Sequence, residues 1–145
     1  MLYPMYSATS NIEQPLVIND TVEEQVSPSN WIKESQIKVY DDRVIIEIEN
    51  AEWAKFTDTN SMDPTIDSEA NAIEIIPANY EEVHIGDIIS YEIPQVNGTI
   101  IHRIINTSFD DNGWYAVAKG DNLNTPDPYK IRFHNIKRIV VAIIY

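Results

Sequence analysis

The chain has 145 residues, 43% of them hydrophobic and 23% charged, and its 23 acidic and 10 basic residues give a formal charge of −13. This length and composition are typical of one globular domain with a hydrophobic core. A strongly acidic surface repels phosphate, which argues against a nucleic-acid partner, and a chain without cysteine has neither disulfides nor thiolate metal sites.

The sequence also predicts no segment that crosses a membrane, because it has no run of 18 or more apolar residues. The first twelve residues carry no charge, but Pro4 and several polar residues interrupt them. They lack the basic start and continuous apolar core of a secretory signal. We therefore expect the chain by itself to be soluble.

The N-terminal part, residues 1–35, is expected to form an irregular acidic arm. It mixes polar residues and prolines with little periodicity, which is typical of a segment without a packed core. Within it, the apolar run at 16–18 has the character of a short edge strand.

From residue 36 the pattern changes to short runs in which β-branched and polar residues alternate. Such alternation predicts half-buried strands, and acidic or Asn-Gly pairs between the runs predict tight turns. The expected strands cover 36–40, 43–49, 53–57, 71–77, 88–93, 99–106, 114–119, 131–133 and 138–144. A single helical turn is expected over 62–66. Residues 36–145 are thus predicted to form a mainly β domain of antiparallel strands with little helix.

Three short motifs contain residue types that are used in catalysis. They are residues 59–65 with Ser61, residues 100–105 with His102, and residues 119–127 with Asp121 and Asp127. Each motif alone has a structural explanation. A serine shortly before a proline is typical of a helix start, a lone strand histidine is usually packed and hydrogen-bonded, and Gly-Asp-Asn is typical of a turn.

Together and in this order, the motifs resemble those of the type I signal peptidase family, over about residues 53–145. In that family a Ser-Met pair precedes a proline, a basic residue precedes Arg-Val or Arg-Ile, and Gly-Asp-Asn leads to a second aspartate. Here His102 follows Ser61 by 41 positions and precedes Asp121 by 19. Because the basic residue is histidine rather than lysine, the chain resembles the archaeal and endoplasmic-reticulum branch. The resemblance implies a β-rich catalytic domain of a serine endopeptidase that removes signal peptides from exported precursors.

The same resemblance implies a role for each residue of the site. Ser61 would be the nucleophile and His102 the general base that takes its proton. An aspartate would orient the imidazole. Asp121 and Asp127 both qualify, and we favour Asp127 because the prolines on either side of it stiffen the loop. The oxyanion would be stabilised by the Ser61 backbone N–H and the Thr59 hydroxyl.

No cofactor or metal is predicted for this site. Neither His84 nor His134 lies in a pattern with convincing metal-ligand spacing, and the chain has no glycine-rich phosphate loop. The expected partner is a polypeptide substrate. Signal peptidases are usually held at the bilayer, so we expect a membrane anchor in a segment outside this chain. The domain would then act at the extracytoplasmic face of the cell membrane.

Two alternatives stay open. The fold could serve as a non-catalytic binding or assembly module, which would suit the acidic surface and an N-terminal part that matches no motif. A self-cleaving regulator is less favoured, because the base is not lysine and no alanine is followed by glycine as in a self-cleavage site.

Overall fold

The structure, a computed structural model, describes residues 11–13 and 15–145. These residues form a mainly β fold with antiparallel sheets and little helix, which confirms the predicted fold class. The chain contacts divide into two compact units. One unit contains residues 31–48 with the described residues up to 25, and the other contains 26–30 and 49–145. The predicted arm at 1–35 falls partly on residues 1–10 and 14, which lie outside the described residues.

The smaller unit contains the predicted hairpin. A short 3-10 helix, η1 (Glu34–Gln36), leads into β1 (Ile37–Val39), which pairs antiparallel with β2 (Val44–Ile46). The side-chain amide of Gln36 donates to the Glu47 carbonyl at 2.6 Å and closes the open end of the hairpin. The prediction of an edge strand at 16–18 is wrong, because these three side chains are exposed and the segment forms no strand. A run of three apolar residues buries too little surface to hold a strand in place.

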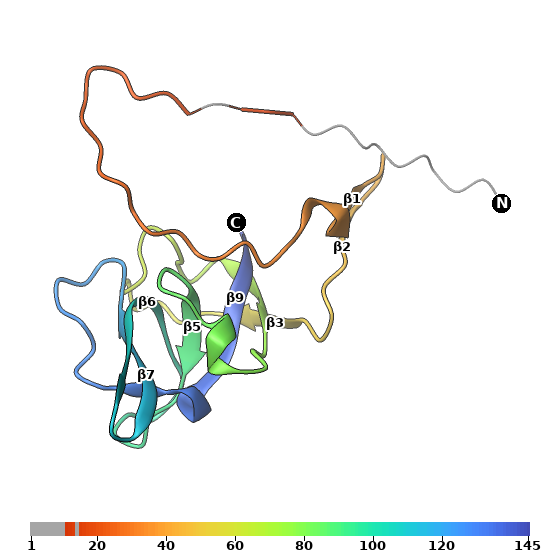
Figure 1. The fold of residues 1–145 in the computed structure, drawn as a ribbon. Coiled ribbons are helices and arrows are strands. Elements are labelled where there is room, and N and C mark those ends of the chain that lie inside the picture. Colours follow the sequence, from red (N-terminus) through yellow and green to blue (C-terminus); the bar gives the residue numbers. More distant parts are fainter. Residues whose placement is uncertain (1–10, 14) are drawn as a thin grey trace. The chain divides into compact units, whose positions relative to one another are not determined.

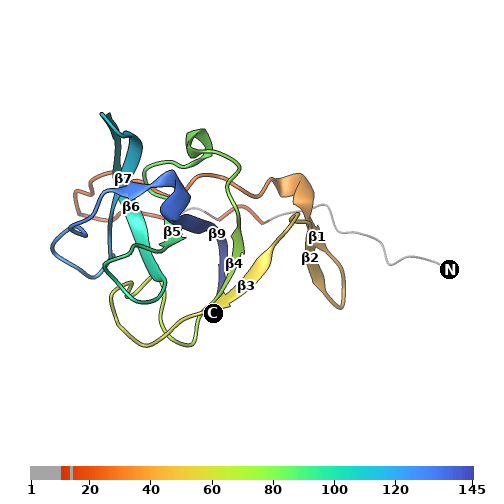
Figure 2. The same ribbon diagram turned by 90° about the horizontal axis from the view of Figure 1, so that it is seen from below.

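The larger unit contains one seven-stranded antiparallel sheet that curls on itself (Figures 1 and 2). Its spatial order is β3-β4-β9-β5-β6-β7-β8, so the last strand in the chain lies between β4 and β5. The strands are β3 (Glu52–Lys55), β4 (Asn71–Ile75), β5 (Ile88–Tyr91), β6 (Ile100–Asp110), β7 (Gly113–Lys119), β8 (Ile131–Arg132) and β9 (Ile136–Ile144). Two further 3-10 helices, η2 (Tyr80–Glu82) and η3 (Phe133–Asn135), lie between strands.

Each strand predicted in this unit is present, with different ends in places. The largest difference is in β6, predicted at 99–106, which continues to Asp110 because it pairs with β7 up to the turn at Gly113. The helical turn expected over 62–66 is present as a single turn, in which the Ile66 N–H donates to the Met62 carbonyl at 3.0 Å, and it does not continue into a helix.

One hydrophobic cluster holds the loop that follows β3 against the sheet. Met62 and Ile66 of this loop are 3% and 4% exposed, and they pack with residues of β4, β5 and β9. Full burial of such a side chain contributes about 1.5–3 kcal/mol. The residue just before Met62 is therefore held at a defined place beside the core.

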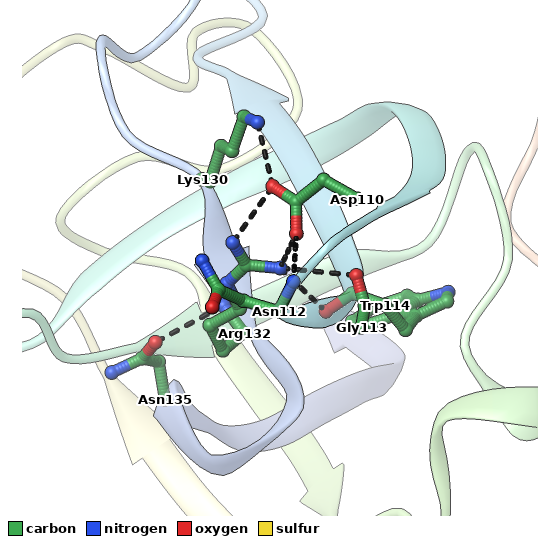
Figure 3. Close-up of polar contacts among 7 residues, drawn as sticks. All are labelled: Asp110, Asn112, Gly113, Trp114, Lys130, Arg132 and Asn135. Atoms are coloured by element: carbon green, nitrogen blue, oxygen red, sulfur yellow. Dashed lines mark hydrogen bonds and ion pairs between the residues drawn. The ribbon is translucent and has the colours of Figure 1, made fainter.

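A second anchor, shown in Figure 3, fixes the far end of the loop between β7 and β8. Both Asp110 oxygens accept hydrogen bonds from the Arg132 guanidinium at 2.9 Å, and Lys130 donates to the same carboxylate at 2.6 Å. The hydrogen bonds from these two cations lower the pKa of Asp110 well below its usual range. The loop of residues 120–130 thus returns to the β6–β7 hairpin at a fixed point.

Candidate active site

His102 lies on β6, opposite Ile89 of β5, and is 8% exposed. Its Nδ1 is 2.8 Å from one oxygen of Asp127 and 3.0 Å from the other. Because an ionised carboxylate only accepts hydrogen bonds, Nδ1 carries the proton in this pair. In the neutral imidazole, Nε2 then has a free lone pair and can accept a proton.

Asp127 is held by contacts on two sides. Its backbone N–H donates to the Ala118 carbonyl at 2.8 Å, and its Oδ2 accepts a hydrogen bond from the Tyr91 hydroxyl at 2.6 Å. Tyr91 is fully buried, and burial together with the bond to Asp127 raises the pKa of its hydroxyl well above the usual value. Tyr91 is therefore a neutral donor that fixes the carboxylate facing His102.

Tyr91 is a site residue that the sequence analysis missed. Ile89 faces His102 across the β5–β6 pair, and Tyr91 follows Ile89 by two positions on the same strand. Since side chains alternate along a strand, Tyr91 and His102 lie on the same face. The hairpin predicted from Asn97-Gly98 is present, but its loop covers 92–99, so the Asn-Gly pair does not by itself set the register that places Tyr91 beside His102.

Asp121, the other candidate orienter, lies away from His102 in a different set of contacts. The Arg103 guanidinium donates to its two oxygens at 2.8 and 2.6 Å, and the Thr65 hydroxyl donates at 2.6 Å. Burial alone would raise the pKa of Asp121, but the hydrogen bonds from Arg103 and Thr65 outweigh it and lower the pKa. The hydrogen bonds of Asp121 thus connect the 120–130 loop to the loop that contains Thr65 and to strand β6.

Ser61 is held against the start of the 120–130 loop. Its carbonyl accepts a hydrogen bond from the Asn122 N–H at 3.0 Å. A Cβ atom added at Gly120 would lie 2.5 Å from the Ser61 carbonyl oxygen and 3.0 Å from His102 Nε2. The Ser61 backbone and the free nitrogen of His102 therefore both adjoin Gly120, which must lack a side chain for them to approach so closely.

The Ser61 hydroxyl has its hydrogen-bond partner on the same loop. Its Oγ is 3.2 Å from Thr59 Oγ1, and either atom can donate. Within the part of the chain that the structure describes, this bond is made with Thr59 and not with His102. Thr59 and Ser61, the two residues predicted to form the oxyanion hole, are thus in direct contact.

Ser61 and His102 line the same cavity, which has a volume of about 400 Å³. Its walls are residues 54–57, at and after the end of β3, and residues 99–102, at the start of β6. Strand β3 is an edge of the sheet. The pairing of β6 with β7 begins at Arg103, so the segment before it also presents an open edge. The cleft is therefore bordered by two strand edges that could pair with an extended peptide.

Other side chains that could in principle act as a general base have different contacts. Lys119 donates to the carbonyls of Gly120 and Leu123 at 3.1 and 2.7 Å, so its ammonium group holds the loop. His84 is 3.8 Å from the buried carboxylate of Asp87. Among residues 11–13 and 15–145, no three His, Cys, Asp or Glu side chains are grouped as they would be for a metal ion.

In the same described ranges, no helix has the length and apolar character needed to cross a bilayer. Comparisons of the chain with profiles of protein families, with curated proteins and with solved structures give no match. The membership of the signal peptidase family stays a prediction from the three motifs. Thr59, Ser61 and His102 line one cleft, and Asp127 is hydrogen-bonded to His102 next to it. Asp121 instead pairs with Arg103 and Thr65.

Proposed function

We propose that the chain is the catalytic domain of a signal-peptidase-like serine endopeptidase. The observation that carries the proposal is the hydrogen bond between His102 and Asp127 beside a cleft that Ser61 also lines. A histidine oriented by a buried carboxylate, with its second nitrogen free near a serine, is the arrangement that activates a hydroxyl nucleophile.

The proposed reaction begins with a rotation of the Ser61 side chain from Thr59 toward His102. His102 Nε2 takes the hydroxyl proton while Oγ attacks the scissile carbonyl carbon. The resulting oxyanion accepts hydrogen bonds from the Ser61 N–H and from the Thr59 hydroxyl, which the rotation releases. Asp127 stabilises the imidazolium through Nδ1.

The tetrahedral intermediate then collapses. The bond between carbon and nitrogen breaks, and His102 gives its proton to the leaving amine. Water attacks the acyl-enzyme with His102 again as the base, and the product acid leaves Ser61 free. In this scheme Asp121 does not touch the reacting groups and acts by holding the 120–130 loop.

The proposed substrate is an exported precursor protein that binds as an extended strand along the cleft edges. The resemblance implies small residues before the cut, and it implies an anchor outside this chain that holds the domain at the extracytoplasmic face of the membrane. An extended segment would pair its backbone with β3 or with the start of β6, which leaves its alternate side chains directed into the cavity.

The test is cleavage of an exported precursor in detergent by the wild type and by Ser61→Ala and His102→Ala. We expect each replacement to lower kcat by roughly 10³-fold or more without unfolding the domain. His84→Ala and His134→Ala, which remove histidines outside the cleft, are matched controls and should cleave normally. Undiminished cleavage by both site variants would reject the proposal.

A second candidate, a non-catalytic peptide-binding module, is favoured by the hydrogen bond of the Ser61 hydroxyl with Thr59. If that bond persists when a peptide binds, the hydroxyl is not activated. A fluorophosphonate reagent separates the two functions, because it labels only an activated serine. Labelling of the wild type and not of His102→Ala supports the peptidase, whereas binding of peptide without labelling supports the module.

A further inference from the structure

The inner part of the cleft is polar. Glu74 of β4 and Ser90 of β5 are each 5% exposed, and both line the cavity together with Arg138 of β9. Ser90 lies directly opposite Arg138 in the β5–β9 pair. Glu52 of β3, opposite Glu74, forms an ion pair with one nitrogen of Arg138 at 2.5 Å. One carboxyl, one guanidinium and one hydroxyl thus line the cavity that the candidate nucleophile also lines, and a second carboxyl pairs with the guanidinium.

Several of these groups have no hydrogen-bond partner. Ser90 Oγ and Arg138 Nε are buried without one. Among the described residues, the Glu74 carboxyl also has no hydrogen bond or ion pair, but its oxygens are not closed to solvent as the other two atoms are. Arg138 is close enough to act on it electrostatically. An unsatisfied buried polar group costs about 1–3 kcal/mol, so Ser90 Oγ and Arg138 Nε call for an explanation. A bound ligand group that satisfies them is one such explanation.

The chemistry of that group follows from what the three atoms require. The Arg138 N–H needs an acceptor, the Glu74 carboxyl needs a donor, and the Ser90 hydroxyl can serve as either. A carboxylate ligand would be repelled by Glu74 and Glu52. A lysine ammonium would pair with Glu74 but leave the Arg138 N–H unsatisfied. A carboxamide supplies an acceptor oxygen and two donor hydrogens without a net charge.

We infer, on the basis of the proposed function, that this cleft selects a substrate with an asparagine or glutamine side chain just before the scissile bond. The carboxamide oxygen would accept from Arg138 and Ser90, and its NH₂ would donate to Glu74. The signal peptidase resemblance implies small residues before the cut. At one of these positions, the polar cavity would prefer a carboxamide side chain of the substrate to a small one.

Burial supports the assignment in a second way. It raises the pKa of Glu74, because an ionised carboxylate is poorly solvated there. A donor from the substrate would stabilise the ionised form and so compensate for part of the lost hydration. An apolar side chain would leave this group as it is in the free protein.

The experiment uses peptides that differ at one position only. Gln, Ala, Glu or Lys is placed in turn at each of the three positions before the cut. Affinity is measured with the Ser61→Ala protein, and kcat/KM with the wild type. At one of the three positions, we expect Gln to exceed Ala at least about 10-fold in both measurements, because three hydrogen bonds each contribute about 0.5 kcal/mol or more. Glu and Lys should fall below Gln.

Two variants show whether the cavity residues cause this preference. Glu74→Leu and Ser90→Ala should each reduce the advantage of Gln over Ala at the selected position. Glu81→Leu, which replaces an exposed carboxyl outside the cleft, is the matched control and should keep it. If Glu74→Leu fails to fold, Ser90→Ala alone decides, because it removes one oxygen from an otherwise unchanged strand.

The outcomes separate the inference from the proposed function. Equal binding and cleavage of all four peptides at every position overturns the inference and leaves the peptidase intact. A preference for Gln in binding without any cleavage overturns the peptidase and supports the carboxamide site. Peptides that neither bind nor react overturn both.

Discussion

The imidazole of His102 and the carboxylate of Asp127 contact each other at 2.8 Å although 25 positions of the chain separate them. Both side chains are nearly closed to solvent, at 10% and 11% exposed. In such surroundings a hydrogen bond to a charged group is stronger than on the surface, and the ring is held in one orientation. The contact is the central feature of the site.

Replacement of Asp127 by Asn should therefore impair the base more than the fold. The amide can present its NH₂ to Nδ1, which would put the imidazole proton on Nε2 and remove the acceptor that faces Ser61. We expect kcat for precursor cleavage to fall on the order of 10²–10⁴-fold with a much smaller change in KM. Asp41→Asn, in the turn of the separate hairpin, is the matched control. Equal kcat values in the wild type and Asp127→Asn would contradict this role.

Tyr91 is expected to position Asp127 without touching the substrate. Tyr91→Phe removes one hydrogen bond, worth about 1 kcal/mol, so kcat should fall roughly 5-fold. A carboxylate with one donor fewer holds the protonated imidazole more strongly, so the acidic limb of the kcat/KM profile should move to higher pH. The same replacement at Tyr115, outside the cleft, should leave the profile in place. An unchanged profile in Tyr91→Phe would mean that the hydroxyl only supports packing.

Gly120 is expected to tolerate no side chain. In Gly120→Ala the added methyl group would be 2.5 Å from the Ser61 carbonyl oxygen, so the two loops must move apart. Overpacking of this kind costs about 1–3 kcal/mol, and the separation of Ser61 from His102 should lower kcat as well. Thermal unfolding and cleavage assays measure the two effects.

Gly98→Ala provides the control for this replacement. Gly98 has a φ of +106° with open space around its Cα, so alanine there strains the backbone without moving any neighbour. We expect Gly98→Ala to lower the melting temperature and retain activity. Retained activity in Gly120→Ala as well would show that the two loops need not stay in close contact.

Asp121→Asn should destabilise the fold in a pH-dependent manner. It weakens the pair with Arg103, whose side chain and that of Asp121 are 19% and 17% exposed, and hydrogen bonds between charged groups contribute about 1.5–3 kcal/mol. Since the pKa of Asp121 is lowered by folding, this stability is present above the unfolded value of about 3.9 and is lost as the pH falls through the folded value.

The free energy of unfolding at pH 7 and at pH 3, measured with urea, checks this expectation. The difference between the wild type and Asp121→Asn should be largest at pH 7 and should shrink toward pH 3. The exposed Asp111→Asn variant should match the wild type at both values. A difference that stays constant with pH would show that the charge of Asp121 contributes nothing.

The strands of this fold were predictable because each is a local pattern. Alternating β-branched residues and turn pairs such as Asn97-Gly98 identify where a strand begins and reverses. The place of β9 between β4 and β5 was not predictable, because it depends on pairings with segments about 50 to 70 positions away. The alternation of apolar and polar residues is the same in a central strand and in an edge strand, so it does not show where in the sheet a strand lies.

For the site, residue types indicated the candidates and tertiary contacts assign their partners. The motif from residue 119 to 127 contains two aspartates with similar turn chemistry. Which of them meets His102 depends on how the loop folds back, and that is decided by the hydrogen bond of Asp127 to Ala118 and by the ion pair of Asp121 with Arg103. Neither contact leaves a local signal in the sequence.

The central position of β9 affects when the site can form during synthesis. Strands β3 and β4 carry one side of the cleft, β5 and β6 carry the other, and only β9 joins them. A ribosome has translated Ser61, His102 and Asp127 before it reaches Ile136. A nascent chain halted before that point would have every reacting group and no assembled cleft, so whatever chemistry the domain performs is withheld from the cell until translation has passed this strand.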